Sequence, residues 1–195
     1  MPRIILASTS RYRRELLARL GLPFDVEAPG TPEVAAAGES PAALAARLAL
    51  AKASSVRTPD ALVIGSDQVA SLDGRILRKP GTHEAAVGQL LHAQGRCVLF
   101  HTAVAVVDTR TGAAAEHLDR TEVRIRHLGR AALEQYVRVE QPLDCAGSFK
   151  SEGLGVVLFE DVSSHDPTAL IGLPLIWLAQ ALRSLGVDPL RSPRS

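Results

Sequence analysis

The sequence predicts a single mixed α/β domain. Strand-like and helix-like segments alternate over the first half of the chain, and a long strand pair then interrupts this alternation. No internal repeat or low-complexity linker divides the 195 residues, and nearly half of them are apolar, so a sizeable core can form. We expect one domain over residues 1–190, followed by a flexible tail over residues 191–195.

The first part of the chain predicts a strand, a helix and a second strand. Residues 3–7 (RIILA) form the apolar run of a buried strand. Hydroxyl residues then supply N-cap candidates for a helix over residues 10–20, which Gly21 ends. Residues 23–28 predict the second strand, which leads into a Pro/Gly-rich loop (APGTPE).

The next part predicts a helix and a strand with a polar centre. Ser40 and Pro41 provide a cap and a first-turn proline for an alanine- and leucine-rich helix that ends near Val56. Residues 61–71 (ALVIGSDQVAS) predict the strand, and residues 73–74 (Asp-Gly) a hairpin turn into RILRK.

The second half predicts three helices and an antiparallel strand pair. Its segments are a helix over 82–92, strands over 98–108 and 115–126, a helix near 130–139, a glycine-rich loop over 145–155 (CAGSFKSEGLG) and a final amphipathic helix within 172–186.

Charge and composition exclude several functional classes. The 22 basic and 21 acidic residues nearly cancel, which argues against the broad basic face of a general nucleic-acid binder, so any anion site must be local. The first apolar run is too short for a signal peptide, and no later run reaches membrane-spanning length. Cys97 and Cys145 are far apart, which favours a reduced protein with both thiols in the core. We expect a cytoplasmic protein.

The segment ASTSRYRREL combines hydroxyl side chains with arginines where a strand gives way to a helix. Free amides at a helix N-terminus and charge-assisted hydrogen bonds from Arg13 and Arg14 suit phosphate oxygens. The alternative is a capped surface helix with solvated arginines.

Three further polar segments interrupt the apolar pattern and carry ionisable groups. Asp67 lies within an apolar strand, where a carboxylate needs a partner, a metal or a function; the alternative is a hydrogen-bonded aspartate near a strand end. Only three of the 22 basic residues are lysines, and Lys52 and Lys79 flank this strand, so they could converge on a phosphate chain or be solvated. The third lysine, Lys150, lies two residues before Glu152. Glu152 is either a surface charge or a hydrogen-bond acceptor for the edge of a nucleotide base.

Taken in order, these segments resemble a known family. The chain contains, in order, the motifs LASTSxxRRxLL, a glutamate at position 33, AxxKA, IGSDQV, KP, CAGSFKSEGxG and GLPL. Together they closely resemble the Maf family of nucleoside triphosphate pyrophosphatases, and within it the 7-methyl-GTP branch. The resemblance runs from about residue 3 to residue 190. It implies a long mixed sheet flanked by helices, with two lobes and a cleft between them, often as a homodimer.

The resemblance also implies chemistry and roles. Family members hydrolyse the bond between the α and β phosphates of a nucleoside triphosphate with a divalent cation such as Mg²⁺, Mn²⁺ or Co²⁺. The proton acceptor falls on Asp67, and a second acidic residue, Glu33, joins it as a metal ligand. The phosphate-binding residues fall on Ser8, Arg13, Lys52 and Lys79. Relatives often carry an acidic pair where this chain has Pro32 before Glu33, which leaves the metal role of Glu33 open.

Substrate choice in the family tracks three positions, which here are Tyr12, Gln68 and Glu152. An aromatic residue, a glutamine and a glutamate at these positions resemble the 7-methyl-GTP branch. The chemistry agrees with this, since an aromatic face attracts a cationic base and a carboxylate matches the donor edge of guanine. The runner-up substrates are dTTP and UTP. A different class, a nucleotide-binding regulator of cell division with little hydrolysis, is the second alternative. We expect Arg11 to be solvated.

Overall fold

The structure is a computed structural model that describes residues 2–191. Its strands are β1 (Arg3–Ala7), β2 (Asp25–Glu27), β3 (Ala61–Leu72), β4 (Arg75–Leu77), β5 (Cys97–Asp108), β6 (Ala114–Ile125) and β7 (Phe159–Ser163). Its helices are α1 (Arg11–Ala18), α2 (Pro41–Ser55), α3 (His83–Ala93), α4 (Arg130–Glu140) and α5 (Leu175–Ser184), with short 3₁₀ turns η1 (Ala146–Ser148) and η2 (Leu154–Leu158).

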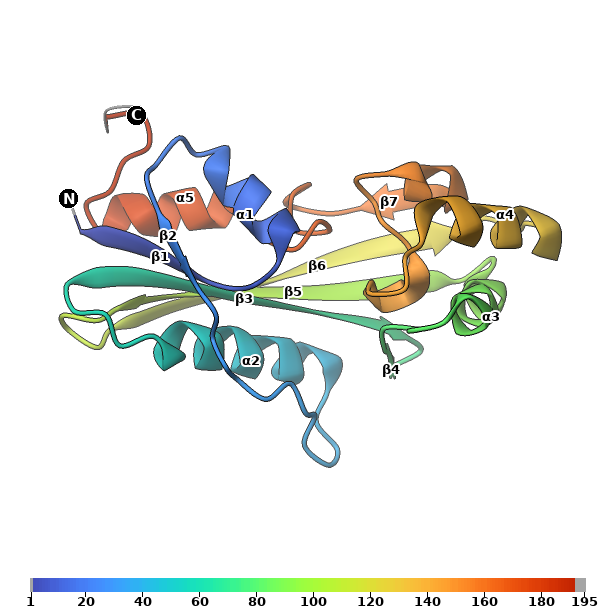
Figure 1. Cartoon of the computed structure of the whole chain (residues 1–195), viewed down its shortest axis with the longest axis horizontal. Coiled ribbons are helices and arrows are strands. Elements are labelled where there is room, and N and C mark those ends of the chain that lie inside the picture. The colour runs from blue at the N-terminus through green and yellow to red at the C-terminus, as the bar shows by residue number, and fades with distance from the viewer. Residues whose placement is uncertain (1, 192–195) are drawn as a thin grey trace.

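Within the described residues, the strands form one seven-stranded mixed sheet with helices on both faces (Figure 1), which confirms the predicted α/β class. The order is β2-β1-β3-β5-β6-β7, and β4 pairs with the end of β3. β1 is parallel to β2 and β3, whereas the later pairings are antiparallel. The predicted long strand pair is the β5–β6 hairpin.

The ends of the elements follow from local chemistry. The side chains of Ser10, Ser40 and Thr82 each accept a hydrogen bond from a backbone N–H in the first turn of α1, α2 and α3, so these helices begin where the sequence predicts. Asp73 and Gly74 both have positive φ, 47° and 77°, as a two-residue hairpin turn requires.

One strand of the sheet, β7, is not predicted from the sequence. β7 is an edge strand whose residues after Phe159 are exposed, so residues 160–163 show no alternation of apolar and polar side chains. The strand forms because β6 supplies its hydrogen-bonding partner. Of the predicted tail, Arg191 closes a turn by donating its N–H to the Asp188 carbonyl, and residues 192–195 lie outside the described residues.

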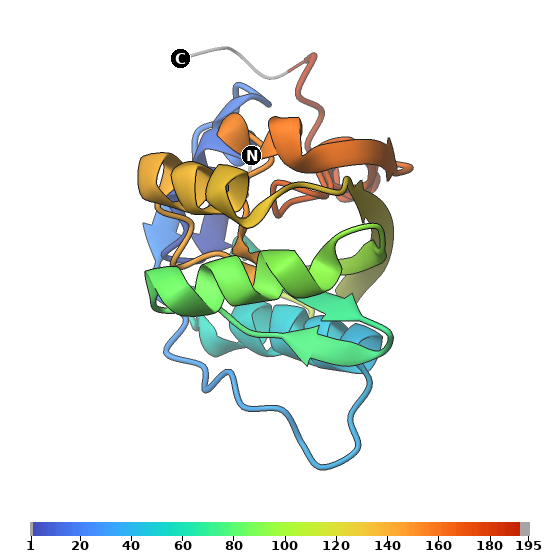
Figure 2. The ribbon, with the colours of Figure 1, turned by 90° about the vertical axis from the view of Figure 1, so that its right-hand side faces the viewer.

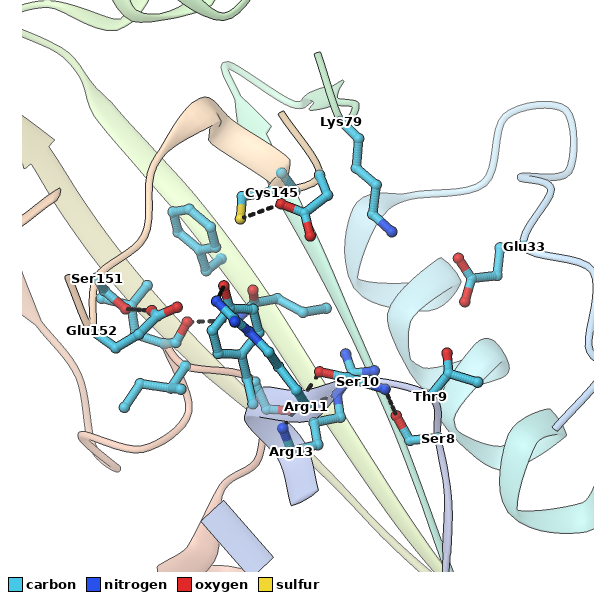
Figure 3. A pocket seen from close by; sticks show the side chains of 18 of the residues that line it. Ser8, Thr9, Ser10, Arg11, Arg13, Glu33, Lys79, Cys145, Ser151 and Glu152 are labelled. Carbon is cyan, nitrogen blue, oxygen red and sulfur yellow. Dashed lines mark hydrogen bonds between the residues drawn. The ribbon is translucent and has the colours of Figure 1, made fainter. Parts of the chain in front are cut away.

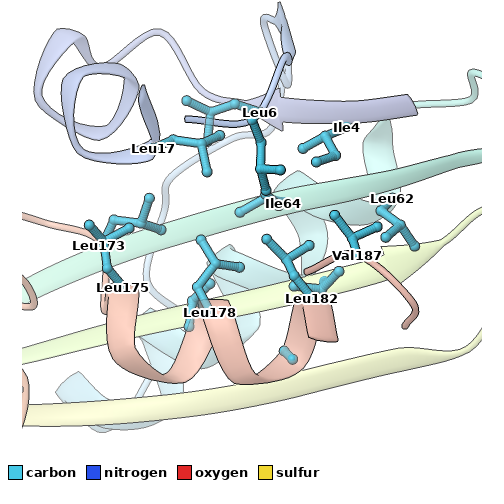
Figure 4. Close-up of a cluster of buried hydrophobic side chains, with 14 of the residues drawn as sticks. Ile4, Leu6, Leu17, Leu62, Ile64, Leu173, Leu175, Leu178, Leu182 and Val187 are labelled. Atoms are coloured by element: carbon cyan, nitrogen blue, oxygen red, sulfur yellow. The ribbon is translucent and has the colours of Figure 1, made fainter. Parts of the chain in front are cut away.

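The central strands are buried on both faces. Ile4 and Leu6 of β1 and Ile64 of β3 pack with Leu178 and Leu182 of α5 on one face (Figure 4). The alternate residues of β1 and β3 turn to the other face and pack on α2. Burial of both faces explains why these strands read as continuous apolar runs.

A third core cluster lies at the other end of the long strands. There α3 and α4 pack against each other and over the ends of β3, β5 and β6 (Figure 2). The chain therefore forms two lobes that share the long strands, as predicted. Among residues 2–191, no helix has the length and apolar character needed to cross a membrane.

Candidate active site

The sheet leaves part of one strand edge open between the two lobes. β1 pairs with β3 only as far as Ala7 opposite Gly65, and β4 joins the same edge from Ala70 onward. Between Gly65 and Ala70 this edge of β3 has no neighbouring strand among the described residues, so side chains from both faces of β3 can reach the same cavity. A cavity of about 470 Å³ lies here, beyond the carboxyl end of β1, where open α/β sheets commonly bind ligands.

The cavity brings most of the predicted residues together. Those in its wall are Ser8, Tyr12, Arg13, Glu33, Lys52, Gln68, Lys79 and Glu152. Figure 3 shows Glu33 and Lys79 on one side of this space and Ser151 and Glu152 on the opposite side. The site therefore has a charged end and a second end formed by the glycine-rich loop.

At the charged end, Lys52 bridges two carboxylates. Its Nζ donates to Asp67 Oδ1 at 2.6 Å and also to Glu33 Oε1. Lys52 and Asp67 are 4% and 6% exposed, whereas the Glu33 side chain is 52% exposed. Of the site residues that the family resemblance implies, Asp67 alone lies behind the wall, and it reaches the cavity through Lys52.

A glycine sets the distance between α2 and β3. A Cβ on Gly65 would lie 2.3 Å from the Ala49 carbonyl oxygen and 2.4 Å from the Ala53 nitrogen, both in α2. The backbone of the strand therefore packs directly on the helix. Lys52 then lies within reach of Asp67, which is two residues beyond Gly65 on the same face.

The electrostatics of this end keep Glu33 ionised. Burial would raise the pKa of Glu33, but the hydrogen bond and charge of Lys52, together with the charges of Lys79 and Arg13, outweigh it and lower the pKa below its ordinary value of 4.5. Two carboxylates that converge on one cationic group also suit a divalent cation, since Mg²⁺ commonly takes one or two protein carboxylates and completes its shell with phosphate oxygens and water. Within residues 2–191, no cluster of three or more His, Cys, Asp or Glu side chains could hold a metal.

The start of α1 carries the groups that the sequence predicts for anion binding, except that Arg14 is exposed and does not line the cavity. Ser10 caps the helix, and Ser8, which is 4% exposed, accepts a hydrogen bond from the Ser10 N–H. Arg13 Nε donates to the Gly172 carbonyl at 2.9 Å, which fixes the guanidinium in the cavity wall. Burial lowers the pKa of Arg13 although the charges of Asp67 and Glu33 oppose this, and a guanidinium stays protonated regardless.

The segment before the GLPL motif is a part of the site to which the sequence assigned no role. The Gly172 carbonyl also accepts from Ser66 Oγ at 2.9 Å, and Gln68 Nε2 donates to the Ala169 and Leu170 carbonyls at 3.0 Å and to Thr102 Oγ1 at 2.9 Å. These contacts place the amide nitrogen of Gln68 against the loop. A glycine followed by Leu-Pro was a visible signal, but its partners Arg13 and Ser66 are more than 100 residues away, in α1 and β3.

At the other end of the cavity, Arg11 covers Tyr12. The Arg11 guanidinium carbon lies 4.6 Å from the centre of the Tyr12 ring, and Arg11 Nη2 donates to the Tyr12 hydroxyl at 2.8 Å. The expectation that Arg11 is merely solvated is therefore wrong: the side chain is exposed, but the neighbouring ring attracts the cation. Glu152 is exposed, and its Oε2 accepts from Ser151 Oγ at 3.3 Å.

The prediction that both cysteines lie in the core is wrong. Both are partly exposed, and Cys145 lines the cavity. Burial, together with the nearby Asp144 carboxylate, raises the pKa of the Cys145 thiol to about 12. This thiol is therefore protonated at neutral pH and is a poor nucleophile.

The fold and the cavity define an α/β protein with a cavity lined by basic, acidic and aromatic side chains. Comparison with known proteins gives the family. Residues 3–185 match the Maf family, described as Maf-like protein, and the chain belongs to that family.

Named relatives agree over nearly the full length. The chain is 57% identical to a 7-methyl-GTP pyrophosphatase of Xanthomonas axonopodis pv. citri, over 95% of this chain and 98% of the relative. It is 52% identical to a 7-methyl-GTP pyrophosphatase of Albidiferax ferrireducens, over 96% of each chain. Among solved structures, the Staphylococcus aureus Ham1 protein is similar at 15% identity and a TM-score of 0.46, covering 77% of this chain and 88% of that one.

Proposed function

We propose that the protein is a nucleoside triphosphate pyrophosphatase that hydrolyses 7-methyl-GTP to 7-methyl-GMP and pyrophosphate. The observation that carries this proposal is a single cavity with Lys52 and Glu33 at one end and Tyr12 and Glu152 at the other, with Asp67 hydrogen-bonded to Lys52 from behind the wall. The names of the 52–57% identical relatives support the same substrate.

In this proposal the charged end binds the triphosphate. A nucleoside triphosphate carries roughly four negative charges at neutral pH, which Lys52, Lys79 and Arg13 would partly offset, with hydrogen bonds from Ser8 and the first amides of α1. The same cations would stabilise the charge that develops on the departing pyrophosphate. A divalent cation, held by Glu33, Asp67 and phosphate oxygens, would supply Lewis-acid stabilisation of that charge.

Asp67 is the proposed proton acceptor. A water molecule attacks the α phosphorus, the bond from that phosphorus to the α–β bridging oxygen breaks, and the bridging oxygen leaves with pyrophosphate. The carboxylate of Asp67 would take the proton of the attacking water, and its contact with Lys52 holds it in place.

The other end would choose the base. Methylation at N7 makes guanine cationic, and the face of Tyr12 would attract such a ring by about 0.5–2 kcal/mol once Arg11 moves aside. The Glu152 carboxylate would accept hydrogen bonds from the N1–H and N2–H₂ groups of guanine. A thymine edge offers one donor flanked by carbonyls and would leave that carboxylate poorly matched.

The test is pyrophosphate release by purified protein with Mg²⁺ or Mn²⁺ and a panel of 7-methyl-GTP, GTP, dTTP and UTP. We expect the highest kcat/KM for 7-methyl-GTP, a loss of rate of about 10²-fold or more in Asp67→Asn, and a smaller preference over GTP in Tyr12→Ala. A preference for dTTP or UTP would favour the runner-up substrates. Tight nucleotide binding without turnover would favour the regulatory role instead.

The metal requirement, the oligomeric state and the cellular location can each be measured separately. EDTA should abolish turnover, and added Mg²⁺, Mn²⁺ or Co²⁺ should restore it. Light scattering coupled to size exclusion tests the homodimer that the family resemblance implies. Cell fractionation tests the cytoplasmic location.

A further inference from the structure

Lys150 is the one lysine that the proposed chemistry does not use. Its side chain is 13% exposed, and its Nζ donates to the Glu140 carbonyl at 2.6 Å, at the last residue of α4. The same Nζ lies 3.6 Å from Glu140 Oε1. An ammonium at this position satisfies a terminal carbonyl of the helix and complements the negative end of its dipole.

Glu140 holds the same loop at a second point. Its Oε2 accepts a hydrogen bond from the Leu154 N–H at 2.7 Å. The backbone N–H of Lys150 in turn donates to the hydroxyl of Tyr136, one turn earlier in α4. The last turn of α4 therefore fixes residues on both sides of the segment 151–153.

The glycines of this loop fit the same arrangement. A Cβ on Gly153 would lie 2.8 and 2.9 Å from the two carboxylate oxygens of Glu140, so the backbone passes against that carboxylate. A Cβ on Gly155 would lie 2.2 Å from the Lys150 carbonyl oxygen, which accepts from the Gly155 N–H. The loop is thus folded tightly around the Lys150–Glu140 pair.

We propose that Glu140 and Lys150 form a clamp that positions Glu152 for recognition of the base. Glu152 lies at the centre of the clamped segment and in the cavity wall, whereas its own side chain is exposed and contacts its neighbour Ser151. Its position is therefore set by the backbone that the clamp holds. This inference rests on the proposed function, since it assigns Glu152 to the base.

A positioning role predicts a particular kinetic signature. A loop that is already ordered costs less free energy to immobilise when the substrate binds, so loosening it weakens binding of the base. The phosphate end, which other elements build, keeps its geometry. The clamp variants should therefore raise KM for 7-methyl-GTP while kcat stays within about twofold of the unaltered protein.

The experiment compares 7-methyl-GTP with 7-methyl-inosine triphosphate, which lacks the 2-amino donor that Glu152 would bind. We expect the unaltered protein to prefer 7-methyl-GTP about tenfold or more in kcat/KM. Glu140→Ala and Lys150→Met should each reduce this ratio to about twofold, as Glu152→Gln does. Combining Glu140→Ala with Glu152→Gln should reduce it no further, because both changes remove the same interaction.

Two control variants make the result specific. Glu140→Gln keeps an oxygen for the Leu154 N–H and should recover most of the selectivity. Glu134→Ala removes an exposed carboxylate that pairs with Arg130 on the same helix, and it should change neither the ratio nor KM. Thermal melting of each variant checks that it is folded.

The clamp is overturned if Glu140→Ala and Lys150→Met are folded and keep the full ratio, if they reduce kcat rather than raise KM, or if their effect adds to that of Glu152→Gln. A Glu152→Gln variant with undiminished selectivity overturns it as well. Failure of the proposed function is a separate result: the unaltered protein would release no pyrophosphate from 7-methyl-GTP.

Discussion

Replacing Lys52 with methionine tests whether the charged end of the cavity is held together by its ammonium group. The change keeps the length and most of the apolar stem of the side chain but leaves the Asp67 carboxylate, which is 6% exposed, without its counter-charge. Removing one partner of a buried ion pair costs about 3–5 kcal/mol. Glu33 is half-exposed and adds little to this loss.

Because Asp67 lies next to an open cavity, we expect a loss in the free energy of unfolding of about 3 kcal/mol, at the low end of that range. For a chain of this length, it corresponds to a fall in melting temperature of roughly 6–12 °C. Urea unfolding at pH 7 and differential scanning calorimetry measure the two quantities. The double variant Lys52→Met/Asp67→Asn should recover at least half of the loss, since it removes the unpaired charge.

Arg3→Met, which removes an exposed ion pair with Asp25, is the matched control and should leave the melting temperature unchanged. Equal effects of Lys52→Met and Arg3→Met would refute the reasoning. So would a double variant with Asp67→Asn that is no more stable than Lys52→Met alone.

Three other changes test separate parts of the site. Gly65→Ala should cost about 1–3 kcal/mol of stability and most of the activity, since its Cβ would displace α2 and with it Lys52; unchanged urea midpoints and rates would contradict this. Arg11→Ala should raise kcat/KM for 7-methyl-GTP and GTP by the same factor, because moving Arg11 off the Tyr12 ring costs the same free energy whichever base binds. A changed ratio of the two kcat/KM values would mean that Arg11 contacts the bound base. The lowered pKa of Glu33 means that its pairing stabilises the fold fully above pH 4.5 and is lost as the pH falls through the folded-state value. Glu33→Gln should therefore unfold with a weaker acid dependence, and an unchanged acid limb of the stability curve would contradict this.

Much of the fold could be predicted because local chemistry sets it. Capping hydroxyls, Pro41 and the Asp73-Gly74 turn fix where elements begin and end, and the apolar runs of the central strands reflect burial on both faces. β7 could not be predicted, since its exposed residues form a strand only because β6 offers them a partner.

The residue types of the candidate site can be read along the chain: hydroxyls and arginines at a helix start, an aspartate within an apolar strand, two flanking lysines and a glutamate in a glycine-rich loop. The tertiary structure alone decided how they meet. Lys52 lies between Asp67 and Glu33 because α2 packs on the bare backbone of Gly65, and Arg13 is fixed by a carbonyl 159 residues away. Such contacts depend on how strands and helices pack across the sheet. The spacing of residues along the chain does not encode how close two side chains come in the folded protein.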